Sequence, residues 1–210
     1  MIKVLIADDH PVVRLGLRQI LADNPDILVG GEAGTAQEVL SLVRGERWDV
    51  VLLDISLPGG NGIELIAEIR KERPETRILI LTGHPEAQYA VRSIKAGAAG
   101  FLNKESAPDR LNEALKKIAE GGRYVSAELA ETLASLVAGE APGQPHERLS
   151  DREFEILKLL ASGKTVSQVA LELSLSVKTI STHRTRILRK MNMNTNAELT
   201  HYAIRQGLVS

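Results

Sequence analysis

The clearest structural signal in this chain is Val50-Val51-Leu52-Leu53-Asp54, in which four apolar residues end in a single carboxylate. A short run that is apolar on both faces and rich in β-branched residues predicts a central strand of a parallel sheet, covered by helices on both sides. Asp54 then lies at the carboxyl end of that strand, the edge at which open α/β sheets bind ligands. Taken alone, Asp54 is equally well interpreted as a reactive acid or as the first residue of a turn.

Apolar strands and amphipathic helices alternate along the first part of the chain. Strands are predicted at 2–7, 27–33, 50–53, 77–82 and 99–103. Helices with apolar residues at three- and four-residue spacing are predicted at 11–24, 35–46, 61–72, 86–96 and 108–119. Thr35 and Glu38 have the spacing of a capping box at the start of the second helix. Together these βα units predict a doubly wound, five-stranded parallel sheet of the flavodoxin-like class.

Length and composition indicate a protein of two domains. The chain has 210 residues, of which 43% are hydrophobic and 25% charged, and the commonest domain has roughly 100–150 residues. No run approaches the ~20 apolar residues of a membrane span, and Asp8 and Asp9 stand where a signal peptide would continue its apolar region. The absence of cysteine excludes disulfides, thiolate catalysis and cysteine-based zinc sites. We therefore expect a cytoplasmic protein that does not interact with membranes.

Charge is distributed unevenly along the chain. Residues 1–148 carry 17 Lys and Arg against 22 Asp and Glu, whereas residues 149–210 carry 9 against 5. An acidic front joined to a basic back predicts two partners of opposite charge preference.

Polar residues follow the predicted strands at the one edge where parallel strands all end. These residues are Asp8, Asp9, Asp54, Thr82 and Lys104. Neighbouring carboxylates repel one another, and Mg²⁺ relieves that repulsion with oxygen ligands while keeping waters that an incoming phosphate can replace. A lysine and a threonine supply donors to phosphoryl oxygens. The edge is therefore predicted to bind Mg²⁺ and to phosphorylate an aspartate.

This pattern resembles the receiver domain of two-component response regulators. The residues that carry the resemblance, all within 1–122, are Asp8-Asp9, Asp54, Leu57-Pro58-Gly59, Thr82 and Gly100-Phe101-Leu102-Asn103-Lys104. The resemblance implies that Asp54 takes a phosphoryl group from the phosphohistidine of a sensor histidine kinase, and that Lys104 contacts this group. It also implies that Asp9, Asp54 and the backbone carbonyl of Ser56 bind Mg²⁺, with Asp8 acting partly through water.

The same resemblance implies a switch at the end of the fourth and fifth strands. Thr82 would close on the phosphoryl group, and Phe101 would follow Thr82 inward. Phe101 lacks the hydroxyl of the tyrosine that many receivers have, and Glu105 stands where a proline is frequent. His10 and His84 flank the pocket without the paired spacing of a metal site, so we interpret both as modulators.

A helix and a flexible tether are predicted between the two halves. Residues 126–137 have leucines at helical spacing, whereas residues 139–147 contain two Pro and two Gly without periodicity. We therefore assign 1–122 to the receiver and 123–148 to a linker, with the boundary between the halves near residue 140.

The basic half, 149–210, predicts a small all-α domain. Ser150 and Glu153 have the spacing of a capping box ahead of an apolar helix. Helices at 166–173 and 177–191 are joined by a short turn, which is the helix-turn-helix arrangement. The outer side of the second helix is polar and basic, as a reader of the major groove requires. It carries Lys178, Ser181, Thr182, Thr185, Arg186 and Arg189.

Two further features of this half concern DNA and pairing. The basic residues within 178–190 are accompanied by no acid, and phosphate contact explains this one-signed charge. They are Lys178, Arg184, Arg186, Arg189 and Lys190. The last helix, 196–206, has Leu199, Tyr202 and Ala203 on one stripe, which we predict to pair two copies of the domain.

The basic half is similar to the LuxR-type helix-turn-helix, and the whole chain resembles a NarL/FixJ-family transcriptional response regulator. The residues that carry this similarity are Leu149-Ser150-Asp151-Arg152-Glu153, Lys178-Thr179-Ile180-Ser181-Thr182-His183 and Asn196-Ala197-Glu198-Leu199. The resemblance implies double-stranded DNA with two half-sites as a partner and a homodimer that forms on phosphorylation. RNA polymerase is a further candidate partner.

Three functions compete at this point: a phosphorylation-gated transcription factor, a phosphohydrolase, and a receiver that acts only as a protein-interaction module. A hydrolase with Asp54 as nucleophile requires a general acid two residues later, where Ser56 stands. We therefore expect no enzyme, apart from slow autodephosphorylation. The interaction module remains the alternative, and DNA binding by residues 145–210 would distinguish it.

Two surfaces of the receiver could pair two copies of the chain. One is formed by helix 86–96 with the fifth strand and the fifth helix, and the other by the first and fifth helices.

Overall fold

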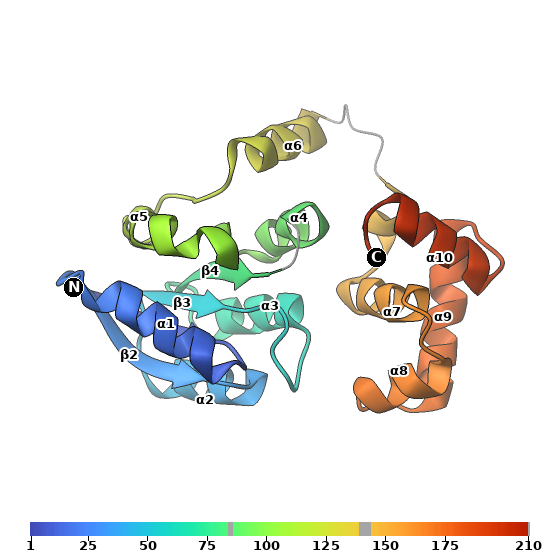
Figure 1. Cartoon of the computed structure of the whole chain (residues 1–210), viewed down its shortest axis with the longest axis horizontal. Helices are drawn as coiled ribbons and strands as arrows, with labels where there is room; N and C mark the ends of the chain where they lie inside the picture. Colours follow the sequence, from blue (N-terminus) through green and yellow to red (C-terminus); the bar gives the residue numbers. More distant parts are fainter. Residues whose placement is uncertain (84–85, 139–143, 210) are drawn as a thin grey trace. The chain divides into compact units, whose positions relative to one another are not determined.

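A five-stranded parallel sheet organises the first half of the chain (Figure 1). Its strands are β1 (Ile2–Ala7), β2 (Ile27–Ala33), β3 (Val50–Leu53), β4 (Arg77–Thr82) and β5 (Gly100–Asn103). They lie side by side in the order β2-β1-β3-β4-β5, which makes β3 the central strand. All residues of β3 are buried, as expected for a strand that is covered on both faces. The predicted doubly wound sheet is confirmed.

The structure is a computed structural model that describes residues 1–83, 86–138 and 144–209. The chain divides into two units, Met1–Ser135 and Leu136–Ser210. His84 and residues 139–143 of the predicted tether lie outside the described residues. Within the described part of the chain, no helix combines the length and the apolar character needed to cross a bilayer.

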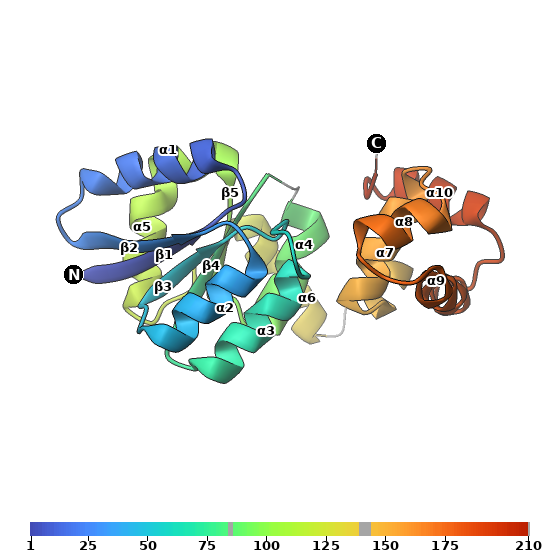
Figure 2. The ribbon, with the colours of Figure 1, turned by 90° about the horizontal axis from the view of Figure 1, so that it is seen from below.

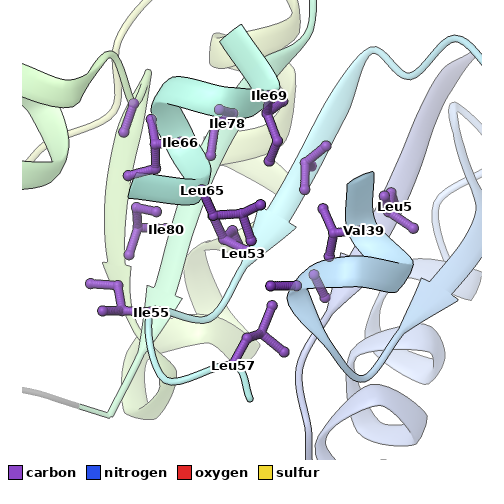
Figure 3. Close-up of a cluster of buried hydrophobic side chains, with 14 of the residues drawn as sticks. Leu5, Val39, Leu53, Ile55, Leu57, Leu65, Ile66, Ile69, Ile78 and Ile80 are labelled. Atoms are coloured by element: carbon purple, nitrogen blue, oxygen red, sulfur yellow. The ribbon is translucent and has the colours of Figure 1, made fainter. Parts of the chain in front are cut away.

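Five helices cover the two faces of the sheet (Figure 2). They are α1 (Pro11–Ala22), α2 (Ala36–Gly45), α3 (Gly62–Glu72), α4 (Glu86–Ala96) and α5 (Ala107–Ala119). Because alternate strand residues point to opposite faces, Val4 and Leu52 pack with α1 and α5, whereas Leu5 and Leu53 pack with α2, α3 and α4. Figure 3 shows the second of these two apolar layers.

The helix starts differ in detail from the prediction. The Thr35 hydroxyl accepts the Glu38 N–H at 3.2 Å, but the Glu38 carboxylate accepts the N–H of Gly34 at 2.7 Å and not that of Thr35. The predicted capping box is therefore only half formed. Helix α5 begins one residue earlier than predicted, after a short 3₁₀ turn, η1 (Lys104–Ser106).

The chain that follows α5 returns to the edge of the sheet. Tyr124 forms a parallel bridge with Gly100. Its N–H donates to the Ala99 carbonyl at 3.1 Å, and its carbonyl accepts the Phe101 N–H at 2.9 Å. This close approach requires a glycine, because a Cβ at Gly100 would lie 2.6 Å from the Tyr124 carbonyl oxygen. The beginning of the predicted linker is thus hydrogen-bonded to β5.

Helix α6 (Ala127–Ala138) follows and packs on the same unit. Leu129 is buried in the apolar layer that also contains Phe101 and residues of α4. The predicted linker at 123–148 is therefore divided between the units. Its start belongs to the sheet, and its end forms a 3₁₀ helix, η2 (Pro145–Arg148), where a flexible tether was expected.

The second unit is the small all-α domain that the sequence predicts. Its helices are α7 (Asp151–Ala161), α8 (Val166–Glu172), α9 (Val177–Met191) and α10 (Asn196–Arg205). Ser150 and Glu153 form the predicted reciprocal capping box. Phe154, Ile180 and Ile187 are buried in the centre of the unit, so α7 and α9 pack against each other. Helices α8 and α9 make the predicted helix-turn-helix.

Candidate functional site

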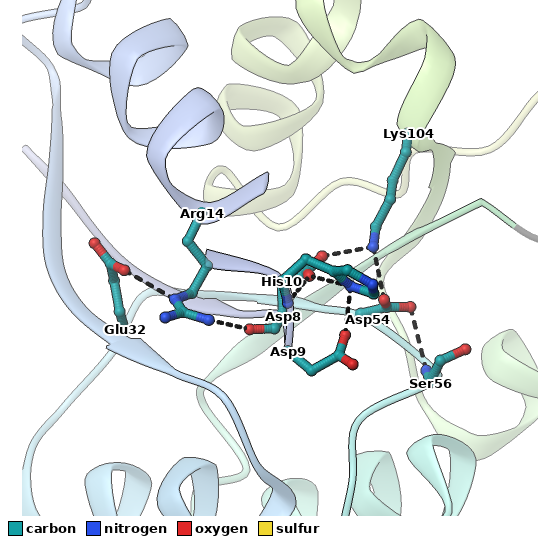
Figure 4. Close-up of polar contacts among 8 residues, drawn as sticks. All are labelled: Asp8, Asp9, His10, Arg14, Glu32, Asp54, Ser56 and Lys104. Carbon is teal, nitrogen blue, oxygen red and sulfur yellow. Dashed lines mark hydrogen bonds and ion pairs between the residues drawn. The ribbon is translucent and has the colours of Figure 1, made fainter. Parts of the chain in front are cut away.

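Charged side chains meet at the carboxyl ends of β1, β3 and β5 (Figure 4). Lys104 Nζ lies 2.6 Å from Asp54 Oδ2 and 2.6 Å from Asp8 Oδ2. Asp8 and Asp54 are only 2% and 4% exposed, a degree of burial that carboxylates reach almost only when they are paired. The predicted convergence of these three side chains is therefore observed, and the parallel topology explains it.

The pocket carries more negative than positive charge. Asp9 adds a third carboxylate. Its Oδ1 is buried and has no hydrogen-bond partner among the described residues, and His10 Nδ1 lies 2.7 Å from it. Burial lowers the pKa of Lys104, but hydrogen bonds to Asp54 and Asp8 and the attraction of both carboxylates outweigh it, so that the pKa lies above its usual value. Lys104 therefore stays charged and neutralises only part of the acidic cluster. Such a set of oxygen donors suits a hard divalent cation.

The other predicted residues lie beside Asp54 or on strands β4 and β5, which follow β3 in the sheet. The Ser56 N–H donates to Asp54 Oδ1 at 3.2 Å, which holds the turn after β3 close to the carboxylate. Thr82 is fully buried at the end of β4, the strand that lies between those leading to Asp54 and to Lys104. Phe101 is buried in the apolar layer next to α4 and α6.

Two side chains at the start of α1 also border the pocket: His10, which was predicted to flank it, and Arg14, which was not predicted (Figure 4). His10 Nδ1 lies 2.7 Å from Asp9 Oδ1 and 3.3 Å from Asp8 Oδ1. Arg14 Nη1 donates to the Asp8 backbone carbonyl at 2.7 Å, and its Nε donates to Glu32 Oε2 at 3.0 Å. Sequence analysis did not identify Arg14. Its position one helical turn after His10 could have indicated it, because residues four apart lie on the same side of a helix.

The loop that carries Lys104 is ordered by its own side chains. The Glu105 N–H donates to Asn103 Oδ1 at 2.9 Å. A proline at position 105 would have no N–H to donate, so the loop in this chain is built on a hydrogen bond that the more frequent proline excludes.

The predicted DNA-contacting residues share one side of α9. All of them are exposed: Lys178, Ser181, Thr182, Thr185, Arg186 and Arg189. The hydroxyls of Thr182 and Thr185 each donate to the carbonyl four residues earlier at 3.0 Å. Their methyl groups and hydroxyl lone pairs therefore remain for a ligand.

Two basic residues of α9 contact their own domain. Arg184 Nε donates to Asn196 Oδ1 at 2.6 Å, and Lys190 Nζ lies 2.5 Å from the buried carboxylate of Glu153. Arg184 and Lys190 therefore have partners within the domain, and phosphate contact by these two residues stays a prediction. The ion pair of Lys190 with Glu153 connects α9 to α7, and the hydrogen bond of Arg184 to Asn196 connects α9 to α10.

Two family models match the chain: the response regulator receiver domain at residues 4–116, and the bacterial regulatory proteins of the luxR family at residues 147–203. The response regulator UvrY of Escherichia coli strain K12 is 38% identical over 209 residues, which cover 99% of this chain and 96% of UvrY. The response regulator GacA of Pseudomonas aeruginosa is 34% identical over 210 residues, 100% of this chain and 98% of GacA.

This chain belongs to the NarL/FixJ family of two-component response regulators. It combines a receiver domain with a LuxR-type DNA-binding domain and is a regulator of transcription.

Solved structures of a related response regulator, RcsB, agree with this assignment. RcsB of Salmonella enterica serovar Typhimurium, bound to the promoter rprA in the presence of the phosphomimetic BeF₃⁻, is similar with a TM-score of 0.70 and 28% identity, over 96% of this chain and 97% of RcsB. A structure of two RcsB dimers bound to two parallel DNAs gives a TM-score of 0.61 and 28% identity, over 96% of each chain.

The stripe predicted to pair two copies of this response regulator lies inside its DNA-binding domain. Leu199 and Ala203 are fully buried where α10 packs against α7, and Tyr202 Oη lies 2.8 Å from His146 Nδ1. The prediction is therefore wrong for Leu199 and Ala203, because so small a domain needs the apolar stripe of its last helix for its own core. Elsewhere on α10, Ile204 is 57% exposed.

His183, which is part of the LuxR-type motif, is partly buried in α9. Its Nδ1 is buried and has no hydrogen-bond partner among the described residues. Burial and the positive charge of Arg186 lower the pKa of His183, and the nearby carboxylate of Glu153 opposes this only in part. The ring is therefore neutral at neutral pH.

Proposed function

We propose that a sensor histidine kinase phosphorylates Asp54 and thereby controls sequence-specific DNA binding by this response regulator. The observation that carries this proposal is the contact of Lys104 Nζ with Asp54 and Asp8, at 2.6 Å each. A cation thus already lies beside the carboxylate where a phosphoryl group would bring further negative charge. An Asp54 oxygen would form the new P–O bond while the P–N bond to the kinase histidine breaks. The protein is then a stoichiometric acceptor.

Mg²⁺ is the cofactor that we propose for this transfer. Asp9, Asp54 and the Ser56 carbonyl would hold it, with Asp8 acting partly through water. The buried Asp9 Oδ1 supports this, since it has no hydrogen-bond partner in the part of the chain that the structure describes and a buried anionic oxygen requires compensation. When bound, the ion would offset the negative charge on the phosphoryl oxygens. Lys104 would orient the same oxygens from the other side.

The signal would leave the pocket through Thr82 and Phe101. Thr82 would move toward the phosphoryl group, and the space it leaves would allow Phe101 to rotate. The Phe101 N–H is bonded to the Tyr124 carbonyl at 2.9 Å, and its ring lies in one apolar layer with Leu129. A rotation of Phe101 would therefore act directly on the first residues of the linker.

The exposed side of α9 would bind the major groove of double-stranded DNA. Thr182 and Thr185, together with Ser181, would discriminate bases through methyl and hydroxyl groups. Lys178 and Arg189, with Arg186, would hold phosphates and set the register. The exposure of all six side chains supports DNA binding by this side of α9, and so does the similarity to RcsB bound to promoter DNA.

Phosphorylation would act by pairing two copies on two half-sites. A single helix-turn-helix module buries only roughly 600–1,000 Å² on DNA, so joining two modules strengthens binding considerably. Leu129 of α6 already packs on the α4 side of the receiver, whereas Val12 and Leu15 of α1 are 80% and 47% exposed. We therefore favour α1 and α5 as the receiver surface, and the part of α10 around Ile204 in the DNA-binding domain.

The proposal is tested by intact-mass spectrometry after incubation with acetyl phosphate and Mg²⁺. The wild-type chain and the control Asp109→Asn, at an exposed acid of α5, should gain one phosphate, and Asp54→Asn none. A normal adduct on Asp54→Asn would move the acceptor to Asp8 or Asp9. DNA affinity is then measured by fluorescence anisotropy with and without phosphorylation. Equal affinity in both states would contradict control by phosphorylation, and failure to bind DNA in either state would favour the interaction module.

A further inference from the structure

The His10 ring turns toward the acidic pocket instead of capping its helix. His10 is the N-cap residue of α1, yet its side chain makes no capping hydrogen bond. Its backbone N–H donates to Asp8 Oδ1 at 2.8 Å, and one ligand atom each from Asp8, Asp9 and His10 lies within 4.8 Å of the others. The side chain is 66% exposed, so that an ion can reach the ring from solvent.

The two distances from His10 Nδ1 to the carboxylates are close to the spacing between neighbouring ligands of an octahedral ion. Ligand atoms at about 2.1 Å from such an ion lie about 3.0 Å from their nearest neighbours. His10 Nδ1 is 2.7 Å from Asp9 Oδ1 and 3.3 Å from Asp8 Oδ1, on either side of that value. The buried Asp9 Oδ1 has no hydrogen-bond partner among the residues described, so a cation bound there would replace only its direct contact with the His10 ring.

We propose that His10 is a nitrogen ligand of the divalent-cation site and raises the affinity of this site for first-row transition ions relative to its affinity for Mg²⁺. This inference rests on the cation site of the proposed function. Imidazole nitrogen binds ions such as Mn²⁺ and Ni²⁺, whereas Mg²⁺ strongly prefers oxygen. The Asp8 and Asp9 carboxylates accept both kinds of ion, so the ring is what separates them. The pocket therefore discriminates between metals through a residue outside the strands.

The experiment uses the full chain without a phosphodonor and two probes. Pulsed EPR of bound Mn²⁺ should show coupling to one imidazole nitrogen in the wild-type protein and none in His10→Gln. Isothermal titration should show that His10→Gln lowers the affinity for Ni²⁺ at least about tenfold. Removing a residue that only hydrogen-bonds to a metal ligand already lowers metal affinity about 10- to 100-fold, and removing a ligand should cost at least as much. The affinity for Mg²⁺ should change less than about twofold.

Two control variants locate the signal. His201→Gln, at an exposed histidine of α10, should leave both probes unchanged, and Asp9→Asn should abolish them. Mg²⁺ and Mn²⁺ binding without nitrogen coupling in the wild-type chain would overturn the role of His10 alone. An equal loss of Ni²⁺ and Mg²⁺ in His10→Gln would also overturn it, because the ring would then only position Asp9. If the wild-type chain binds no divalent ion, the cation site of the proposed function fails with it.

Discussion

The receiver pocket and the recognition helix reach their ligands in opposite ways. The pocket joins Asp54 and Lys104, 50 positions apart in the chain, and the carboxylate is buried against the ammonium. The recognition side belongs to one helix, Val177–Met191, and its proposed contact residues are exposed. In the pocket Lys104 also compensates the buried carboxylates of Asp8 and Asp54, so function and stability are coupled there. On α9, function and stability are separable, except at Arg184 and Lys190, whose side chains bond to Asn196 and Glu153 of the same domain.

The two sides of α10 provide the largest test of this separation. Leu199→Ala should lower the free energy of unfolding of the DNA-binding domain by about 3 kcal/mol, because it leaves a cavity in a packed core. Ile204→Ala should cost less than about 0.5 kcal/mol but should weaken pairing of phosphorylated chains. Urea unfolding and analytical ultracentrifugation measure the two effects. A large loss of stability in Ile204→Ala would show that the exposed side is also structural.

Lys104 in the pocket and Lys178 on α9 should show the same contrast, because substitution of the first should destabilise its domain and substitution of the second should not. Lys104→Met leaves two buried carboxylates uncompensated and should destabilise the receiver by about 2 kcal/mol, below the value for a fully buried pair because Lys104 is partly exposed. Added Mg²⁺ should reduce the difference, since a cation can replace the missing charge. Lys178→Met should change stability by less than about 0.5 kcal/mol. The measurement is urea unfolding with and without Mg²⁺, and equal effects of both substitutions would contradict the comparison.

Within the recognition helix, salt should separate base contacts from phosphate contacts. Arg189→Ala should lower affinity about evenly for all DNA sequences and reduce the log-log salt slope by about one. Thr182→Ala should reduce discrimination at one base pair by about 1 kcal/mol at nearly constant slope. Anisotropy titrations over a range of salt concentrations on matched and altered sites report both quantities. If both variants altered only the slope, the assignment of base-reading residues would be wrong.

The smallest effect is expected at His183. Its pKa is lowered in the folded chain, whereas the unfolded value is about 6.5, so the unfolded state binds more protons as pH falls through that value. The stability that the neutral ring contributes is present above about pH 6.5 and declines below it. His183→Gln should reduce the pH dependence of the urea midpoint between about pH 7.5 and 5.5, and His201→Gln should leave this dependence unchanged. Glu153 has a lowered pKa, so its contribution is lost only below its unfolded pKa of about 4.3.

The order of strands and helices was predictable because it depends on local periodicity. Apolar runs such as 50–53 and the spacing of leucines in α7 are visible in the chain itself. The convergence of Asp8, Asp54 and Lys104 was predictable for a related reason, since parallel strands all end at one edge. The Ser150–Glu153 capping box formed as predicted because both of its partners are local.

Only the tertiary structure decided which side of an element meets another element. The stripe of Leu199 and Ala203 was read correctly as apolar, but α7 covers it within the same chain. Lys190 was read correctly as basic, but its partner is Glu153 on another helix. The turn of His10 toward Asp9 was equally invisible in the sequence. Periodicity reports that a surface is apolar or charged, whereas the group that pairs with it is set by long-range packing, to which no local pattern is sensitive.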